Sequence, residues 1–269
     1  MIDFDKLVKE YNKKGIPTPD RKMIKTPVQI EGIRKAGVVN TKVLDYVSEN
    51  IHVGMSTDEI NTLVHTKTLE LGGIPAPLNY EGFPKSVCTS INDEVCHGIP
   101  SKDVILKDGD IINVDCTTIV DGYYADASRM FLIGNVDENA KNLVRVTKEC
   151  LDLAVKELHP FSRLRDIGYV IEKHAKANGY SVVHNIGGHG VGLEFHEDPF
   201  IYHFGKKNTG MVLFPGMVFT IEPMVNEGTN QVFLDADNNW TIYTDDGGWS
   251  AQYEYTVLIT EDGVEILTH

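Results

Sequence analysis

The feature that most restricts the fold of this 269-residue chain is a repeated order of elements, two helices followed by short strands. Apolar spacing and end signals predict helices over 27–48, 57–71, 138–158 and 165–178. Capping boxes mark the first two starts, where Thr26 precedes Gln29 and Ser56 precedes Glu59. The third helix starts 111 residues after the first (138 − 27), and the fourth starts 108 residues after the second (165 − 57). These similar offsets predict two structurally related halves around one cleft.

Short runs rich in valine, isoleucine, threonine and tyrosine predict the strands of both halves. They are expected near 86–91, 94–98, 110–119 and 123–132, and then near 181–186, 217–226, 231–235, 240–243 and 250–260. The pattern predicts an α+β fold with a single domain over 26–269, made of halves at about 26–134 and 135–269. Residues 1–25 are expected to be an N-terminal extension with an extended linker, which either packs on the domain as a surface arm or docks a partner.

The bulk composition excludes several classes of protein. A formal net charge of -14 argues against nucleic-acid binding, because phosphate contacts require a basic surface. No run of about 18 apolar residues could span a membrane, and the acidic, polar N-terminus does not resemble a signal peptide. The four cysteines form neither a disulfide framework nor a zinc ribbon. We therefore expect a cytoplasmic protein without membrane or direct nucleic-acid partners.

A predicted hairpin places two aspartates on one face of a sheet. Asp121-Gly122 is a strong turn signal between two apolar runs. Counting outward from this turn places Asp115 opposite position 128, so that Asp115 lies diagonal to Asp126 on the same face. Carboxylates this close repel one another unless a metal ion or a proton lies between them. The alternative is a pair of solvated surface aspartates, although the apolar strands favour burial.

Two further kinds of segment carry candidate metal ligands. His189 and His196 lie in a glycine-rich stretch, where the backbone can approach a ligand closely, although each could be a structural histidine. Glu222 and Glu254 are each expected within an apolar strand, where an unpaired carboxylate is costly. Each could instead cap a backbone or pair with a lysine. Glu222 lies 107 residues after Asp115 (222 − 115), close to the helix offset, so each half would supply two strand carboxylates.

Four carboxylates and one imidazole together make an oxygen-rich donor set. The set is Asp115, Asp126, His189, Glu222 and Glu254. It suits two divalent ions of Mn²⁺, Fe²⁺, Co²⁺ or Zn²⁺, with room for a bridging hydroxide. Because four carboxylates balance the charge of two such ions, the sequence predicts a dimetal cleft.

In this order and context, the five residues resemble the metal set of the methionine aminopeptidases and of the wider pita-bread metallopeptidases, which include the proline dipeptidases. Segment 86–100, which ends in Cys96-His97-Gly98-Ile99-Pro100, closely resembles the type I methionine aminopeptidase signature. The resemblance runs from about residue 26 to the C-terminus. It implies a pita-bread fold, with two pseudo-symmetric halves around a central antiparallel sheet. It also implies removal of the initiator methionine from nascent proteins and peptides, with preference for a small second residue.

The resemblance also implies roles for individual residues. A bridging hydroxide would attack the scissile carbonyl, Glu222 would carry the proton, and His97 and His196 would bind and orient the substrate. The methionine side chain would contact Tyr80, Phe83, Cys88, Phe195 and Trp240. Independently, a hairpin count around Asn92-Asp93 places Cys88 opposite His97, although Cys88 could also be core packing.

Two alternatives to the aminopeptidase are considered. An X-Pro dipeptidase uses the same metal frame but usually carries a second N-terminal domain. A non-catalytic binding module typically lacks metal ligands, whereas all five are present here. The resemblance further implies a monomer that acts on nascent polypeptide N-termini, with the ribosome as a further candidate partner.

Overall fold

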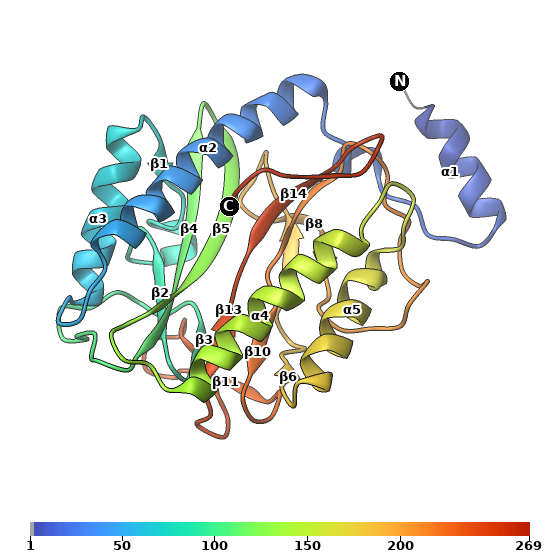
Figure 1. Cartoon of the computed structure of the whole chain (residues 1–269). Coiled ribbons are helices and arrows are strands. Elements are labelled where there is room, and N and C mark those ends of the chain that lie inside the picture. Colours follow the sequence, from blue (N-terminus) through green and yellow to red (C-terminus); the bar gives the residue numbers. More distant parts are fainter. Residues whose placement is uncertain (1–2) are drawn as a thin grey trace.

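The computed structural model describes residues 3–269, in which helices and strands follow the predicted order (Figure 1). The α-helices are α1 (Phe4–Lys13), α2 (Pro27–Asn50), α3 (Thr57–Glu70), α4 (Glu138–Glu157) and α5 (Leu164–Ala177). The strands are β1 (Ile74–Pro75), β2 (Cys88–Ile91), β3 (Glu94–Cys96), β4 (Ile111–Val120), β5 (Tyr123–Leu132), β6 (Ser181–Val182), β7 (Gly188–Gly190), β8 (Glu197–Ile201), β9 (Val218–Ile221), β10 (Met224–Asn226), β11 (Val232–Leu234), β12 (Ile242–Thr244), β13 (Ser250–Gln252), β14 (Tyr255–Ile259) and β15 (Val264–Ile266). The expected α+β class and its four principal helices are confirmed.

Side-chain caps explain where the principal helices begin. Thr26 accepts the backbone N–H of Gln29, and the Gln29 side chain accepts the backbone N–H of Thr26. Ser56 and Glu59 make the same pair of hydrogen bonds at the start of α3. Asp137 caps α4, as expected. Each cap satisfies N–H groups that no helical carbonyl can reach, which is typically worth about 1 kcal/mol.

The hairpin of β4 and β5 has the predicted register. Asp115 pairs with Ser128, and Asp126 lies two residues before Ser128, so both aspartates face the same side of the sheet. Asp121 and Gly122 form the turn with φ values of 52° and 82°. These left-handed values are what a two-residue hairpin turn requires, which explains the Asp-Gly pair.

Two predicted strands are interrupted where each meets a glutamate. The expected strand over 217–226 divides into β9 and β10 around Glu222, and the one over 250–260 divides into β13 and β14 around Glu254. The prediction that each glutamate lies within a strand is therefore wrong. Pro223 has no N–H to offer a ladder, and the N–H of Glu254 donates to the carbonyl of Ser128 in the other half.

Each half packs around its own hydrophobic cluster. In the first half α2 and α3 cover β4 and β5 around Leu44, Ile60 and Ile112, and in the second half α4 and α5 enclose a cluster that includes Leu151 and Ile167 (Figure 1). Corresponding helices start 111 (138 − 27) and 107 (164 − 57) residues apart. The two-half organisation is confirmed, although the expected central sheet consists of several antiparallel segments.

The N-terminal segment contains a helix that was not predicted from the sequence. The rings of Phe4 and Tyr11 on α1 each lie 5.8 Å from the ring of Phe214 in the second half. Residues 16–20 form neither helix nor strand, as expected of a linker. Helix α1 thus packs on the domain, as the surface-arm interpretation expects, and docking of a partner stays a prediction. The apolar spacing at Phe4, Leu7, Val8 and Tyr11 is the signal that could have found α1.

Four short strands were also not predicted, namely β1, β7, β8 and β15. Strand β7 consists of Gly188, His189 and Gly190, and glycine suppresses the strand signal. Within residues 3–269, the helices are all too short or too polar to cross a bilayer.

Candidate active site

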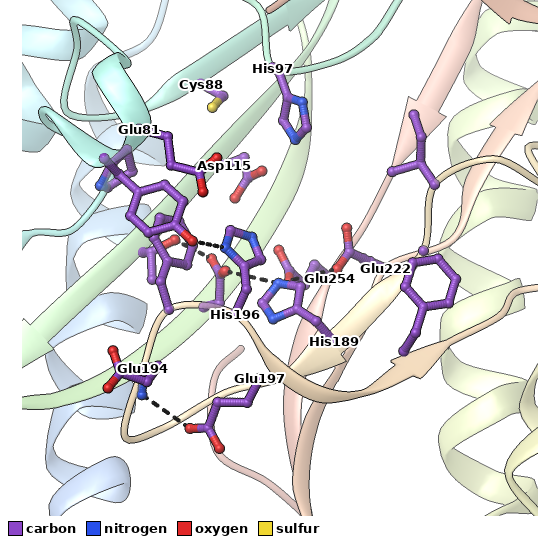
Figure 2. A pocket seen from close by; sticks show the side chains of 18 of the residues that line it. Glu81, Cys88, His97, Asp115, His189, Glu194, His196, Glu197, Glu222 and Glu254 are labelled. Atoms are coloured by element: carbon purple, nitrogen blue, oxygen red, sulfur yellow. Dashed lines mark hydrogen bonds and ion pairs between the residues drawn. The ribbon is translucent and has the colours of Figure 1, made fainter.

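A cleft with a volume of about 960 Å³ is lined by side chains from both halves (Figure 2). It contains the five predicted metal ligands Asp115, Asp126, His189, Glu222 and Glu254. It also contains the other predicted site residues, Tyr80, Phe83, Cys88, His97, Phe195, His196 and Trp240. The structure thus brings together residues that are spread over more than half of the sequence.

The five candidate ligands come from both halves. Asp115 and Asp126 lie on β4 and β5, His189 lies on β7, and the two glutamates lie at the strand ends described above. His189 Nε2 is 3.7 Å from Asp126 Oδ2 and 3.7 Å from Glu222 Oε1. One donor atom each from Asp126, His189 and Glu254 lies within 4.8 Å of the other two. Figure 2 shows Asp115 and Glu222 beside this group.

Burial disfavours the negative charge of these carboxyl groups. It raises the pKa of Asp115 to about 7 and that of Glu222 to about 8. Burial, followed by repulsion from Asp115, raises the pKa of Asp126 well above its usual value. Burial, followed by repulsion from Asp126, does the same for the pKa of Glu254. Each shift reports an environment that disfavours negative charge unless a cation is present.

His189 completes a donor set that fits divalent metal ions. Burial lowers the pKa of His189 to about 3, so the imidazole is neutral at pH 7. Its Nδ1 lies 2.9 Å from the carbonyl oxygen of Gly190, which assigns the proton to Nδ1. The lone pair of Nε2 then faces the acids. Four carboxyls and one neutral imidazole are ligands that manganese, iron, cobalt and zinc accept.

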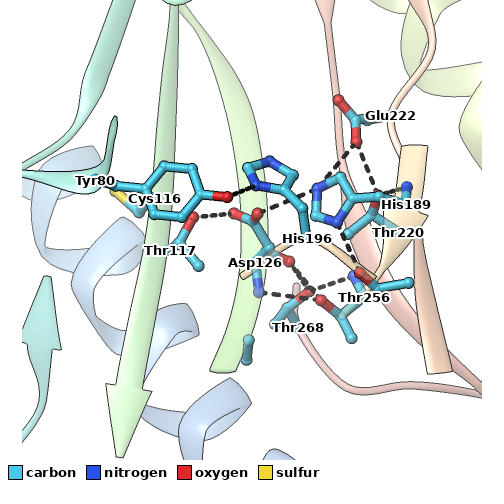
Figure 3. A network of polar contacts seen from close by, with 12 residues as sticks. Tyr80, Cys116, Thr117, Asp126, His189, His196, Thr220, Glu222, Thr256 and Thr268 are labelled. Carbon is cyan, nitrogen blue, oxygen red and sulfur yellow. Dashed lines mark hydrogen bonds and ion pairs between the residues drawn. The ribbon is translucent and has the colours of Figure 1, made fainter. Parts of the chain in front are cut away.

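Threonine hydroxyls hold two of the acids, although these threonines were not predicted from the sequence (Figure 3). These threonines are Thr117, Thr220, Thr256 and Thr268. Thr117 donates to Asp126 Oδ1 and Thr220 donates to Glu222 Oε1, each at 2.8 Å. The other two donate to the carbonyl oxygen of Asp126 at 2.8 and 3.0 Å. The hairpin register could have found Thr117, because it pairs with Asp126 across β4 and β5.

Two further histidines lie in the cleft. His196 Nδ1 is 2.9 Å from the hydroxyl oxygen of Tyr80, and its ring centroid is 4.3 Å from that of His189. His97 has a left-handed backbone with φ of 57°. Burial lowers the pKa of His97 to about 4 and also lowers the pKa of His196. At pH 7 both are neutral, so each can donate one N–H to a bound molecule or accept one.

Aromatic rings and a thiol form the apolar part of the cleft. The rings of Tyr80 and Phe195 are 4.6 Å apart, and those of Phe83 and Trp240 are 5.1 Å apart. Cys88 is buried in the lining of the same cleft, and burial raises the pKa of its thiol well above the usual value. A cleft lined by a neutral thiol and aromatic rings suits a polarizable, unbranched apolar side chain.

The predicted pairing of Cys88 with His97 is wrong. The turn at Asn92 forms, but β2 pairs with β4 whereas β3 pairs with β12. The backbone bond that joins the two segments runs from the N–H of Thr89 to the carbonyl of Gly98 at 2.9 Å. His97 follows the last residue of β3, and its left-handed backbone is not compatible with a continued strand. Both predicted side chains nevertheless line the same cleft.

Comparison with known proteins assigns the chain to a family. The sequence pattern of metallopeptidase family M24 matches residues 31–261. Methionine aminopeptidase A of Synechocystis sp. is 50% identical over 240 residues, which cover 89% of this chain and 94% of that protein. The chain belongs to the methionine aminopeptidases of family M24. The predicted family and the predicted class of enzyme, a metallo-aminopeptidase, are therefore confirmed.

Solved structures separate the aminopeptidase from its nearest alternative. Methionine aminopeptidase from Rickettsia prowazekii matches with a TM-score of 0.90 and 43% identity, covering 91% of this chain and 99% of that one. Prolidase from Pyrococcus furiosus matches with a TM-score of 0.73 and 26% identity, and 65% of that chain is covered. The pita-bread fold is confirmed, and the aminopeptidase is favoured over the X-Pro dipeptidase. Membership of a metallopeptidase family, together with the donor cluster, supports the use of divalent metal.

Proposed function

We propose that this aminopeptidase removes the initiator methionine from nascent proteins and peptides, with preference for a small second residue. The observation that carries the proposal is the position of the donor cluster beside the aromatic, thiol-containing pocket in one cleft. The pocket would hold the methionine side chain while the scissile bond lies over the donors. An aminopeptidase needs this arrangement, because the first side chain and the first peptide bond must be bound together.

We assign two divalent ions, of Mn²⁺, Fe²⁺, Co²⁺ or Zn²⁺, to Asp115, Asp126, His189, Glu222 and Glu254. The buried carboxyl groups support this assignment, because four ionised carboxylates would balance two divalent charges. When bound, such ions polarise a carbonyl and lower the pKa of water towards neutrality.

The protein's own groups would then guide the reaction. Glu222 would move the proton, since Thr220 holds one of its oxygens and the Gln252 side chain donates to the other at 3.2 Å. His196 would hydrogen-bond the scissile carbonyl oxygen or the next amide, while Tyr80 occupies its Nδ1. His97 would position the peptide nitrogen and help it to leave.

We further propose a cytoplasmic monomer that acts on nascent polypeptide N-termini. Residues 26–269 would form the catalytic domain, with halves at about 26–134 and 135–269, and 1–25 would form its N-terminal extension. Contact with the ribosome is a separate hypothesis that co-sedimentation with ribosomes would test.

The experiment that tests the proposed function begins with removal of bound metal by a chelator. The protein is then assayed with Met-Ala-Ser, Met-Lys-Ser and an X-Pro dipeptide, with each of the four ions in turn. We expect metal-dependent release of methionine from Met-Ala-Ser alone. Cleavage of only the X-Pro dipeptide would identify a dipeptidase, and no cleavage of any substrate would support a binding module.

A further inference from the structure

We infer that Lys25 is a positioning residue of the active site, acting through Glu197 on the loop 192–196. This loop carries Phe195 and His196, so the inference rests on the role proposed above for His196. Lys25 and Glu197 were not among the residues predicted from the sequence. They lie 172 positions apart and meet beside the cleft.

Lys25 is a buried lysine with a single ionic partner in the described residues. Its side chain is 1% exposed and forms an ion pair with Glu197, whose side chain is 15% exposed. A buried ammonium group is costly unless it is paired. The backbone N–H of Lys25 donates to the carbonyl of Gly216 at 2.8 Å, and this bond holds the Lys25 backbone against the segment before β9. Lys25 is therefore held at both its backbone and its side chain.

The carboxylate of Glu197 organises the loop. One oxygen, Oε1, accepts the N–H groups of Leu193 and Glu194 at 2.7 and 3.1 Å, while the other faces Lys25. Figure 2 shows the bond from Glu194. Hydrogen bonds to a charged acceptor are stronger than those to a neutral one. The two N–H donors lie just before Phe195 and His196 in the chain. The carboxylate therefore holds the backbone that leads into these two residues.

The burial of this pair distinguishes it from its neighbour. Lys22 Nζ lies 3.0 Å from Asp198 Oδ2, but the two side chains are 66% and 60% exposed. Solvent screens such an exposed pair, which contributes little. Loss of Lys25, by contrast, leaves the Glu197 carboxylate partly buried without its cation. The carboxylate would then turn towards water and release the two loop amides.

The test begins with Lys25→Met, which keeps the length of the side chain and removes its charge. We expect kcat on Met-Ala-Ser to fall about 10- to 100-fold with a smaller change in KM, because orientation is lost. Hydrogen exchange at the amides of Leu193 and Glu194 should accelerate about tenfold or more. In a His196→Ala background, the same substitution should lower kcat less than about threefold, because groups that act through one another are not additive.

Partner substitutions distinguish positioning from general destabilisation. Lys25→Met combined with Glu197→Gln should recover most of kcat, because the glutamine oxygen can still accept both N–H groups and leaves no buried charge. Lys25→Arg should retain more activity than Lys25→Met. Arg34→Met is the matched control, since it removes an ion pair with Glu265 outside the cleft and should leave kcat and loop exchange unchanged. If Lys25→Met does not fold, Glu197→Ala takes its place, because it removes the acceptor of both loop amides and should likewise accelerate exchange at Leu193 and Glu194.

Normal exchange at Leu193 and Glu194 in Lys25→Met would overturn the inference, and so would additive losses with His196→Ala. A wild-type rate for His196→Ala alone would instead contradict the role proposed for that histidine. Faster loop exchange in Lys25→Met would still establish the link from Lys25 to the loop. The two failures are therefore distinguishable.

Discussion

The four acidic candidate ligands of the cleft lie beside one another, and burial makes each of them require a cation or a proton. Hydroxyl and amide groups hold some of these carboxyls in one orientation, as Thr220 and Gln252 do for Glu222. At the scale of single residues, the site thus buries carboxyl groups at a cost to folding stability and holds them in one orientation. Single substitutions should consequently affect activity and stability in opposite directions.

Glu222→Gln should lower kcat by about 10²- to 10⁴-fold, because the proton carrier is lost. The metal-free variant should nevertheless be at least as stable at pH 8 as the metal-free parent, since a buried carboxyl is replaced by a neutral amide. Steady-state kinetics and thermal unfolding measure the two effects. Glu157→Gln, on the surface of α4, is the control and should change neither. Retention of parental kcat by Glu222→Gln would contradict its role.

His97→Ala should slow catalysis by about 10²-fold while metal content stays the same, because His97 contacts substrate and not metal in the proposed arrangement. Elemental analysis of the purified variant and single-turnover kinetics measure the two quantities. An unchanged rate would remove His97 from the mechanism, and loss of metal would make it a ligand.

Residue types and spacing indicated the acids, His189 and His196, because a buried acid on an apolar segment and histidines among glycines are conspicuous in the sequence. The aromatic pocket and the role of His97 came from the resemblance to the methionine aminopeptidases. The supporting groups were not identifiable. Thr256 in β14 and Thr268 after β15 carry no signal in the sequence that places them beside Asp126. Nothing in the sequence distinguishes Lys25 and Glu197 from surface residues, and only the fold shows that they are buried as a pair.

At the scale of elements, close backbone approaches lock α2 against the C-terminal segment. A Cβ on Gly37 of α2 would lie 2.1 Å from the carbonyl oxygen of Leu267. The next residue, Thr268, donates to the backbone of Asp126. Helix packing is thus connected to the position of a candidate metal ligand by a short series of contacts.

Gly37→Ala should destabilise the protein by about 1–3 kcal/mol, because the methyl group meets backbone that must shift. This loss exceeds the gain of up to about 1 kcal/mol that alanine brings to a helix interior. Urea unfolding measures the difference. Gly263→Ala is the matched control, since a Cβ there has no neighbour within 4 Å. A Gly37→Ala variant more stable than its parent would show that the C-terminal segment moves freely.

Helices were predictable because their caps are local, and the β4–β5 hairpin was predictable because its turn is local. Strand ends and sheet partners depend on distant segments, which explains the errors around Glu222, Glu254 and Cys88. Strand β7 was missed since its glycines carry no strand preference, and its pairing with β8 and β9 is what defines it.

At the scale of the whole molecule, stability should depend on metal and pH together. The pKa values of Asp115 (about 7) and Glu222 (about 8) are raised in the fold from ordinary values of 3.8 and 4.5. At these carboxyl groups the folded protein binds more protons than the unfolded chain up to about pH 8, whereas the buried histidines have the opposite effect below their ordinary pKa of 6.5. The stability of the metal-free protein should therefore fall as pH rises from about 7 to about 8.

Thermal unfolding at pH 7 and pH 8, with and without added Mn²⁺, measures this dependence. The metal-free protein should melt at a lower temperature at pH 8, and Mn²⁺ should raise its melting temperature more at pH 8 than at pH 7. Glu222→Gln should reduce the pH dependence of the metal-free form. Equal melting temperatures of the metal-free parent at both pH values would contradict the raised pKa values.

The proposed ligands come from β4 and β5 in one half and from β7 and the ends of β9 and β14 in the other. A bound ion would therefore join the two halves as a reversible cross-link. Its supply would then govern how often the halves separate. In a cell short of metal, the protein would lose activity and also open more often, which exposes its chain to proteases. The amount of this protein, and not only its rate, should follow the metal supply.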